Sequence, residues 1–362
     1  MYRAAVMVAP GQSLEVRSYP EPEMEPGSVL LDTIYSEVCG TDVHLYHGRL
    51  AGVPYPIIPG HVSVGRISRI VGEVKDVEGE ALREGDSVAF LDVHETCGSC
   101  WYCLVAKATT RCPSRRVYGI TYSADEGLLG GWSEAIHLKP GVKVLRLPQG
   151  LTPKRYISAG CGLPTAIHAL ERAEVQLGDA VVVQGCGHVG LNAAILAQLS
   201  GATEVIVVGA PRKRLEMAQA VGADHTVDIE EYGPEERIAM VQELTRGRGA
   251  DVTIEATGNP AAVPEGMRMT RDNGRYVVVG QYTDAGPVEI NPHWDINRKH
   301  LEIRGCWGSD FSHFYRGIKA LAKHGDRFPY EDFISRVYGL DAINEALADV
   351  EELRVVKAVV QP

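Results

Sequence analysis

The chain has 362 residues, and its 36 Lys+Arg against 47 Asp+Glu give a formal net charge of −11. Hydrophobic residues make up 45% and charged residues 23%, which is typical of soluble globular proteins and excludes intrinsic disorder. The acidic charge argues against a nucleic-acid partner. The most apolar stretch, Ala180–Leu199, is interrupted by polar residues, so we expect no membrane span. Because the N-terminus lacks a signal-type pattern, we expect a cytoplasmic protein, and the length favours two domains.

The first 150 residues predict short strands separated by turns of Pro, Gly and Asp. Apolar or alternating runs cover Arg3–Val8, Ser28–Ser36, Gly65–Val71, Ser87–Val93 and Val142–Leu147. Many short strands at this spacing are typical of a β-rich sandwich or barrel.

Four of the eight cysteines lie close together in one loop of this half. They are arranged as Cys97-x2-Cys100-x2-Cys103-x8-Cys112. Such clustering in a chain without a signal peptide favours a metal site over disulfides. Four thiolates can close a tetrahedral zinc site with no open position, so we predict a structural zinc ion here.

From Thr152 onward, strands alternate with helices, which is typical of a parallel α/β sheet. Helices are predicted over Pro153–Ala173, with an interruption at Gly-Cys-Gly, and over Val189–Ser200, Lys213–Val221 and Phe311–His324. Strands are predicted over Ala180–Gln184, Glu204–Val208, Thr226–Asp228, Asp251–Glu255, Arg275–Val279 and Val355–Val360.

A glycine-rich turn stands between the first of these strands and the next helix. Its pattern is G-x-G-x-x-G, with glycines at Gly185, Gly187 and Gly190 and with His188 and Val189 between the last two. The first glycine permits a tight turn, the second a close approach to a pyrophosphate, and the third close packing of helix on sheet. We therefore predict a dinucleotide site, with the anion at the helix N-terminus.

The next strand ends in Gly209, where an NAD-binding protein usually carries an acidic residue for the ribose hydroxyls. Arg212 and Arg214 follow, and an arginine nearby can accommodate the 2′-phosphate of NADP. The same arginines can equally be the solvated start of a helix, with NAD bound through other contacts. The predicted cofactor is thus NAD or NADP.

Three further residues, Cys39, His61 and Cys161, form a borderline-soft ligand set that would leave a fourth zinc position open. Their spacing alone does not link them. Taken together in this order, the motifs resemble the zinc-dependent medium-chain alcohol dehydrogenase family, which includes polyol and threonine dehydrogenases. The resemblance spans the chain through Cys39–Asp42, Gly60-His61, Cys97–Cys112, Gly160–Gly162 and Gly185–Gly190.

The resemblance implies an α/β protein with a GroES-like β-rich catalytic domain over residues 1–153 and 302–362. A Rossmann domain with a doubly wound parallel sheet would occupy residues 154–301. It further implies one catalytic zinc ion held by Cys39, His61 and Cys161, besides the structural ion. Members of the family assemble into homodimers or homotetramers, which we expect here as well.

The resemblance also assigns roles to residues around the metal. Thr41 and His44 match the family's proton relay, and Asp42 matches a residue that orients His61. Lys357 stands where a basic residue often lies near the cofactor phosphates.

The chain departs from the family pattern in three places. Val62 replaces a glutamate that usually follows the zinc-binding histidine, the last cysteine interval is x8 where x7 is usual, and Gly209 replaces the acid. None of these removes an expected zinc ligand.

The predicted reaction is hydride transfer between an alcohol and NAD(P), giving a ketone or an aldehyde. Ala51, Phe90–His94 and Trp132 are candidate pocket walls, and their mostly apolar character favours a hydrophobic secondary or cyclic alcohol over a polyol. Two alternatives stay open: a zinc-free NADPH quinone or enoyl reductase-like enzyme, and a non-catalytic nucleotide-binding protein.

Overall fold

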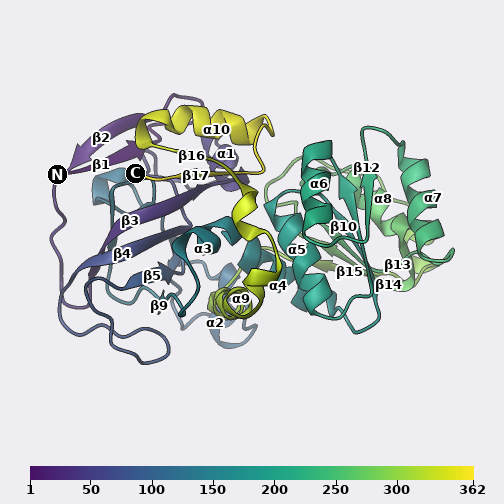
Figure 1. Cartoon of the computed structure of the whole chain (residues 1–362), viewed down its shortest axis with the longest axis horizontal. Helices are drawn as coiled ribbons and strands as arrows, with labels where there is room; N and C mark the ends of the chain where they lie inside the picture. The colour runs from purple at the N-terminus through teal and green to yellow at the C-terminus, as the bar shows by residue number, and fades with distance from the viewer. The chain divides into compact units, whose positions relative to one another are not determined.

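The chain folds into two units in a computed structural model that describes residues 1–362 (Figure 1). The first unit comprises Met1–Gly160, Asp310–Gly325 and Tyr330–Pro362. The second unit comprises Cys161–Ser309 and Asp326–Pro329. Each unit buries a hydrophobic core of its own.

The first unit is built around a seven-stranded sheet in which strand β3 (Val29–Val38) is the central element. The sheet order is β16-β17-β3-β4-β5-β9, and β8 also pairs with β3. The other strands are β4 (Ser63–Ile70), β5 (Ser87–Phe90), β8 (Ala135–Leu138), β9 (Val144–Arg146), β16 (Ile334–Tyr338) and β17 (Lys357–Val360). Two two-stranded ribbons complete the unit: β1 (Tyr2–Val6) with β2 (Glu15–Tyr19), and β6 (Val93–Glu95) with β7 (Arg116–Val117).

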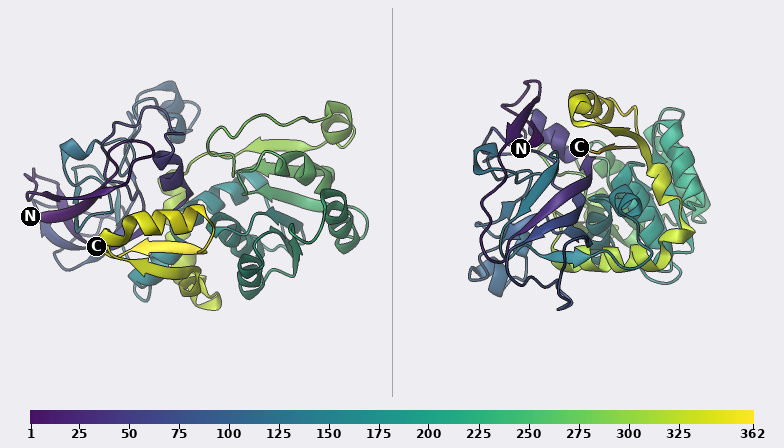
Figure 2. Two further views of the ribbon diagram at one scale, coloured as in Figure 1. Left: turned by 90° about the horizontal axis from the view of Figure 1, so that it is seen from above. Right: turned by 60° about the vertical axis from the view of Figure 1, so that its left-hand side comes forward.

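The C-terminal segment returns to the first unit, because β17 pairs antiparallel with the end of β3. Figure 2 shows helix α10 (Ile343–Glu351) lying along β16 and β17. The remaining helices of this unit are α1 (Gly40–Tyr46), α2 (Trp101–Leu104), α3 (Pro153–Ala159) and α9 (Phe311–His324). Short 3-10 turns lie at Thr109–Arg111, Ala124–Glu126, Tyr330–Phe333 and Leu340–Ala342.

The second unit contains a six-stranded, all-parallel sheet of order β12-β11-β10-β13-β14-β15. Its strands are β10 (Ala180–Gln184), β11 (Glu204–Gly209), β12 (His225–Asp228), β13 (Ala250–Glu255), β14 (Thr270–Val278) and β15 (Glu302–Gly305). Helices α4 (Gly162–Ala173), α5 (His188–Leu199) and α6 (Arg212–Ala220) lie on one face, and α7 (Pro234–Leu244) and α8 (Ala262–Met269) on the other (Figure 1). The π-helical segment Pro292–Asn297 precedes β15. The strand order reverses between β10 and β13, so the carboxyl end of β10 is the place where such sheets bind ligands.

Local signals explain the ends of the elements. The Thr152 hydroxyl accepts a hydrogen bond from the N–H of Arg155 at 3.1 Å, and Pro153 occupies the first helical position of α3. Gly160 then ends α3 with a φ of +51°. The predicted fold class is confirmed, and so is the interruption between α3 and α4.

No helix in this structure combines the length and the apolar character that crossing a bilayer requires.

Candidate functional site

Helix α1 begins directly where strand β3 ends, with Cys39 as its N-cap. The Asp42 carboxylate accepts a hydrogen bond from the backbone N–H of Cys39 at 2.9 Å and is completely buried. A buried carboxylate therefore fixes the backbone that carries the Cys39 thiol.

Cys39 and His61 are brought together although 22 positions separate them in the sequence. The Cys39 Sγ lies 3.8 Å from the His61 Nε2, and the His61 Nδ1 lies 3.9 Å from the Asp42 Oδ1. Zn–S bonds of about 2.3 Å and Zn–N bonds of about 2.0 Å at a tetrahedral angle place the two donor atoms about 3.5 Å apart. The pair thus fits two corners of a zinc site, with Asp42 on the far side of the imidazole.

Burial and neighbouring groups shift the pKa values of both Asp42 and His61. Burial, followed by the nearby Cys39 sulfur, raises the pKa of Asp42 well above its usual range. Burial disfavours charge on His61, but the Cys39 thiolate, the hydrogen bond to it and Asp42 together raise the pKa of His61 to about 10.

Thr41 and His44 lie three positions apart in α1, so they share one face of the helix. Both are partly exposed, whereas Asp42 and Leu45 on the opposite face are buried. Burial, with Arg49 as the next cause, lowers the pKa of His44, so its imidazole is neutral at pH 7.

Lys357 lies in a buried ion pair. Its Nζ is 2.6 Å from the Glu37 Oε1, and both side chains are only 1% exposed. Strand register explains the pair: Glu37 lies opposite Val359, and Lys357 is two residues further along the same face of β17. The structure thus gives Lys357 a carboxylate partner within the first unit, and its role near the cofactor phosphates stays a prediction.

Cys161 is the first residue of the second unit and follows Gly160, the last residue of the first long segment of the first unit. A Cβ on Gly160 would lie 2.1 Å from the Glu37 Oε2, so the chain passes directly over Glu37 one residue before Cys161. Within the second unit, the Cys161 Sγ lies 3.1 Å from the His188 Nε2.

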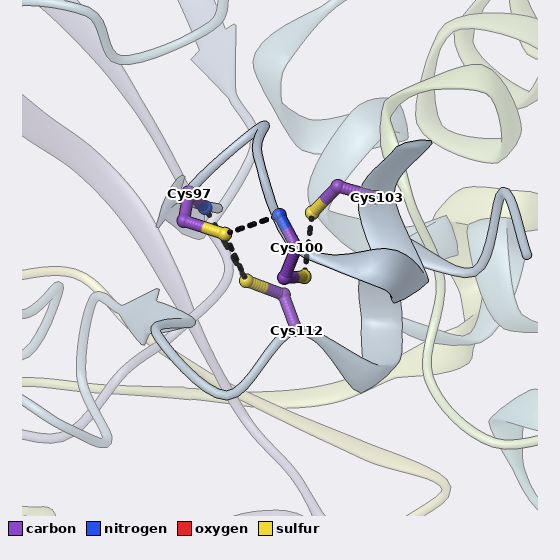
Figure 3. A group of neighbouring side chains, drawn as sticks. All are labelled: Cys97, Cys100, Cys103 and Cys112. Carbon is purple, nitrogen blue, oxygen red and sulfur yellow. Dashed lines mark hydrogen bonds between the residues drawn. The ribbon is translucent and has the colours of Figure 1, made fainter. Parts of the chain in front are cut away.

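The four clustered cysteines converge in the first unit (Figure 3). All four sulfur atoms lie within 4.8 Å of one another, with 3.5 Å between Cys100 and Cys103 and 3.6 Å between Cys97 and Cys112. Zn–S bonds of about 2.3 Å in a tetrahedron place sulfur atoms about 3.8 Å apart. Hydrogen bonds from Ser99 and from the N–H of Cys100 lower the pKa of Cys97 to about 6, which favours its thiolate. The longer last interval therefore does not remove Cys112 from the group.

The glycine-rich turn joins β10 to α5 as the motif predicts. Gly185 adopts a φ of +103°, and a Cβ on Gly190 would lie 1.9 Å from the Gly185 carbonyl oxygen. Gly187 is the N-cap of α5, and His188 and Val189 open the helix. The free N–H groups of this first turn form the anion site of a dinucleotide fold.

The end of β11 has no room for an acidic side chain. A Cβ on Gly209 would lie 2.6 Å from the Cys186 Sγ, so the cysteine of the glycine turn occupies that space. Arg214 is partly buried, and its Nη1 lies 3.9 Å from the position of a Cβ on Gly187. Arg212 points to solvent and pairs with Glu231 at 3.3 Å. Only Arg214 thus lies beside the turn.

Two of the expected pocket walls belong to hydrophobic cores instead. The side chain of Trp132 has no exposed surface, and its Nε1 donates a hydrogen bond to the Glu37 carbonyl at 3.0 Å. Phe90 is 2% exposed and packs edge-on against Tyr118. The expectation for these residues is wrong because both fill the interior of the first unit.

Sequence reasoning missed Glu37, Cys186 and the side-chain role of His188. Glu37 had a signal, since it is an acidic residue directly before the apolar Val38 at the end of β3. The contacts of Cys186 and His188 join segments that no local pattern connects.

Comparisons with known proteins found similar sequences and structures over nearly the whole length of the chain. The family model described as "Alcohol dehydrogenase GroES-like domain" matches residues 25–149, and the one described as "Zinc-binding dehydrogenase" matches residues 189–323. The 5-exo-hydroxycamphor dehydrogenase of Pseudomonas putida is 34% identical over 360 residues, covering 99% of this chain and 98% of that protein. The erythritol/L-threitol dehydrogenase of Mycolicibacterium smegmatis is 30% identical and covers 89% of each chain.

Among solved structures, an alcohol dehydrogenase from Thermotoga maritima superposes with a TM-score of 0.94 at 34% identity, covering 100% of this chain and 99% of that one. These matches favour the zinc-binding branch over the two alternatives that the sequence left open. The chain belongs to the zinc-dependent medium-chain alcohol dehydrogenase family and is an enzyme that interconverts an alcohol and its carbonyl product with NAD(P).

Proposed function

We propose that the enzyme acts on a hydrophobic secondary or cyclic alcohol and its ketone. The relative from Pseudomonas putida, which matches nearly the whole chain, is named for a hydroxylated camphor, a cyclic alcohol. The polyol dehydrogenase among the relatives covers less of the chain at lower identity. The similarity to the hydroxycamphor enzyme is the observation that favours this substrate class.

The catalytic zinc ion is proposed to lie between Cys39, His61 and Cys161. The carrying observation is the spacing of 3.8 Å between the Cys39 Sγ and the His61 Nε2, with Asp42 behind the imidazole. Cys161 directly follows Gly160, which packs on Glu37. Glu37 in turn stands two positions before Cys39 in the sequence. The cysteine group Cys97, Cys100, Cys103 and Cys112 is proposed to hold a structural ion, because its four sulfurs leave no open position.

Zinc, when bound, acts as a Lewis acid that acidifies an alcohol, and the nicotinamide accepts the hydride. Thr41 is proposed to accept the alcohol proton at its hydroxyl oxygen, and His44, neutral at pH 7, to serve as the base that finally holds it. Asp42 holds the Cys39 turn through a hydrogen bond and is proposed to orient the His61 ring, whose Nδ1 lies 3.9 Å from the Asp42 Oδ1. Gly185, Gly187, His188, Val189 and Gly190 would bind the cofactor diphosphate, with Arg214 rather than the solvent-facing Arg212 beside it.

The family pattern also supports a cytoplasmic homodimer or homotetramer as the working form. Catalytic and cofactor-binding functions would divide between domains of residues 1–153 with 302–362 and residues 154–301.

A substrate panel tests the proposed class. Initial rates of reduced-nicotinamide formation would be compared for borneol, 5-exo-hydroxycamphor, cyclohexanol, erythritol, sorbitol and L-threonine, with NAD and with NADP. We expect kcat/KM for the cyclic alcohols to exceed that for the polyols by about 10-fold or more, since a site that binds a cyclic hydrocarbon frame leaves the further hydroxyl groups of a polyol without hydrogen-bond partners. A preference for erythritol, sorbitol or threonine would contradict the proposal.

Thr41 variants separate proton transfer from folding. Thr41→Val keeps the shape of the side chain and removes the hydroxyl, so we expect kcat to fall by about 100-fold or more. Thr41→Ser retains the hydroxyl and should keep most of the rate. Equal losses in the two variants would remove Thr41 from the relay.

A further inference from the structure

We infer that His188 is a positioning residue that couples the nucleotide-binding turn to the Cys161 sulfur. The inference rests on the proposed function in one respect, namely that Cys161 is a zinc ligand. The supporting observation does not involve the other proposed zinc ligands, Cys39 and His61. The His188 Nε2 lies 3.1 Å from the Cys161 Sγ, and both residues belong to the second unit.

The helices around this contact are shaped to permit it. Cys161 is the N-cap of α4 and His188 is the first residue of α5, so the contact joins the starts of two packed helices. A Cβ on Gly162 would lie 2.8 Å from the His188 Cδ2 and 2.8 Å from its carbonyl oxygen. Only a glycine at 162 therefore lets the imidazole reach the sulfur.

The backbone of His188 is held as well. The buried Asn192 donates from its Nδ2 to the His188 carbonyl oxygen at 2.7 Å. The N–H of His188 belongs to the first turn of α5, which forms the anion site of the fold. One residue thus faces the cofactor diphosphate with its backbone and the Cys161 sulfur with its side chain.

The chemistry of the contact gives it a function. A cysteine that binds zinc is a thiolate, and a thiolate accepts a hydrogen bond from an imidazole N–H. Such a bond fixes the direction of the sulfur and adjusts its donor strength, and loss of an interaction of this kind typically costs 10- to 100-fold in metal affinity. A cofactor that orders the turn will therefore order the sulfur too. Coupling between two binding sites is reciprocal. Zinc bound at Cys161 must therefore strengthen cofactor binding by the same factor by which the cofactor strengthens zinc binding.

The test compares cofactor affinity with and without the catalytic zinc. NADH and NADPH would be titrated by fluorescence into the full chain carrying both zinc ions, and into protein dialysed against a chelator until about one zinc per chain remains. We expect the wild type to bind the preferred cofactor about 5-fold or more tightly when both ions are present. In His188→Ala this ratio should fall to about 1.

Two variants control for indirect effects. His188→Gln keeps an N–H donor and should retain part of the coupling. His168→Ala removes a different histidine, which lies in α4 and contacts the Gly308 carbonyl at 2.7 Å, and should retain all of the coupling. A cobalt-substituted enzyme gives a second readout, because the sulfur-to-metal absorption band should shift on adding cofactor in the wild type and stay fixed in His188→Ala.

Three results would overturn the inference. His188→Ala could keep the wild-type ratio, which would remove the coupling. It could lose one zinc ion per chain outright, as a ligand variant does, which would make His188 a ligand. Cys161→Ser could retain both zinc ions, in which case the proposed metal site itself fails, and the two failures are thereby distinguished.

Discussion

Glu37 and Lys357 form an ion pair that is buried in the first unit. Both side chains are 1% exposed. Removing one partner breaks the buried ion pair and leaves the other charge buried without it, which typically costs about 3–5 kcal/mol. We expect Glu37→Gln and Lys357→Met each to lower the free energy of unfolding by that amount, measured by urea denaturation.

The double variant E37Q/K357M serves as the matched control for this pair. It lacks both charges of the pair, so it should recover much of the loss in free energy of unfolding. A double variant as unstable as the sum of the two single variants would show that the charges contribute independently.

At Gly209, the neighbouring Cys186 decides which side chains the cofactor site can accept. Gly209→Asp alone should clash with the Cys186 sulfur, 2.6 Å from the new Cβ, and lower stability. With Cys186→Ala added, the carboxylate can bind ribose hydroxyls and repel a 2′-phosphate. We expect the double variant to shift the ratio of Kd values toward NAD by about 10-fold or more, relative to Cys186→Ala. A single variant Gly209→Asp with unchanged stability and the same shift would contradict this steric account.

At the scale of elements, strongly patterned segments could be predicted from the sequence and those formed by distant contacts could not. Helix α9 lies at Phe311–His324, as predicted, because its apolar positions recur with helical spacing. Helix α1 was missed because Cys39–Asp42 looks like a turn, although Asp42 carries a capping signal. The pairing of Cys161 with His188 had no local signal at all, since 27 positions separate them.

Asp310 begins helix α9, and its effect on stability should depend on pH. Its carboxylate accepts hydrogen bonds from the N–H and the hydroxyl of Ser312. The hydrogen bond with His313, ahead of those with Ser312, lowers the pKa of Asp310. The stabilisation is therefore complete above the pKa of about 3.9 in the unfolded chain and is lost as the pH falls below it.

Asp310→Ala should accordingly cost about 1 kcal/mol of unfolding free energy at pH 7. The difference from the wild type should shrink between pH 5 and pH 3 in urea titrations. Asp310→Asn keeps a capping oxygen without the charge, so it should cost less and show no such pH dependence. A constant difference for Asp310→Ala would mean that the carboxylate charge contributes nothing.

At the scale of the whole molecule, the chain carries two proposed zinc sites with different donor chemistry. The four-cysteine group lies entirely within the first unit, as do Cys39 and His61. Cys161 lies one residue beyond the first unit. All of these residues could be predicted as ligands from the sequence motifs and the family resemblance. The distances between their donor atoms could not be predicted, because they depend on how the chain folds.

The most direct test of this account is the zinc content per chain of the wild type and of Cys39→Ser and Cys103→Ser, measured by atomic emission after exhaustive dialysis. We predict about two ions in the wild type and about one in each variant. The fold should survive in Cys39→Ser, whose four-cysteine group is intact, as circular dichroism would show. Two ions retained in Cys39→Ser, or one or none in the wild type, would contradict the proposed catalytic zinc site.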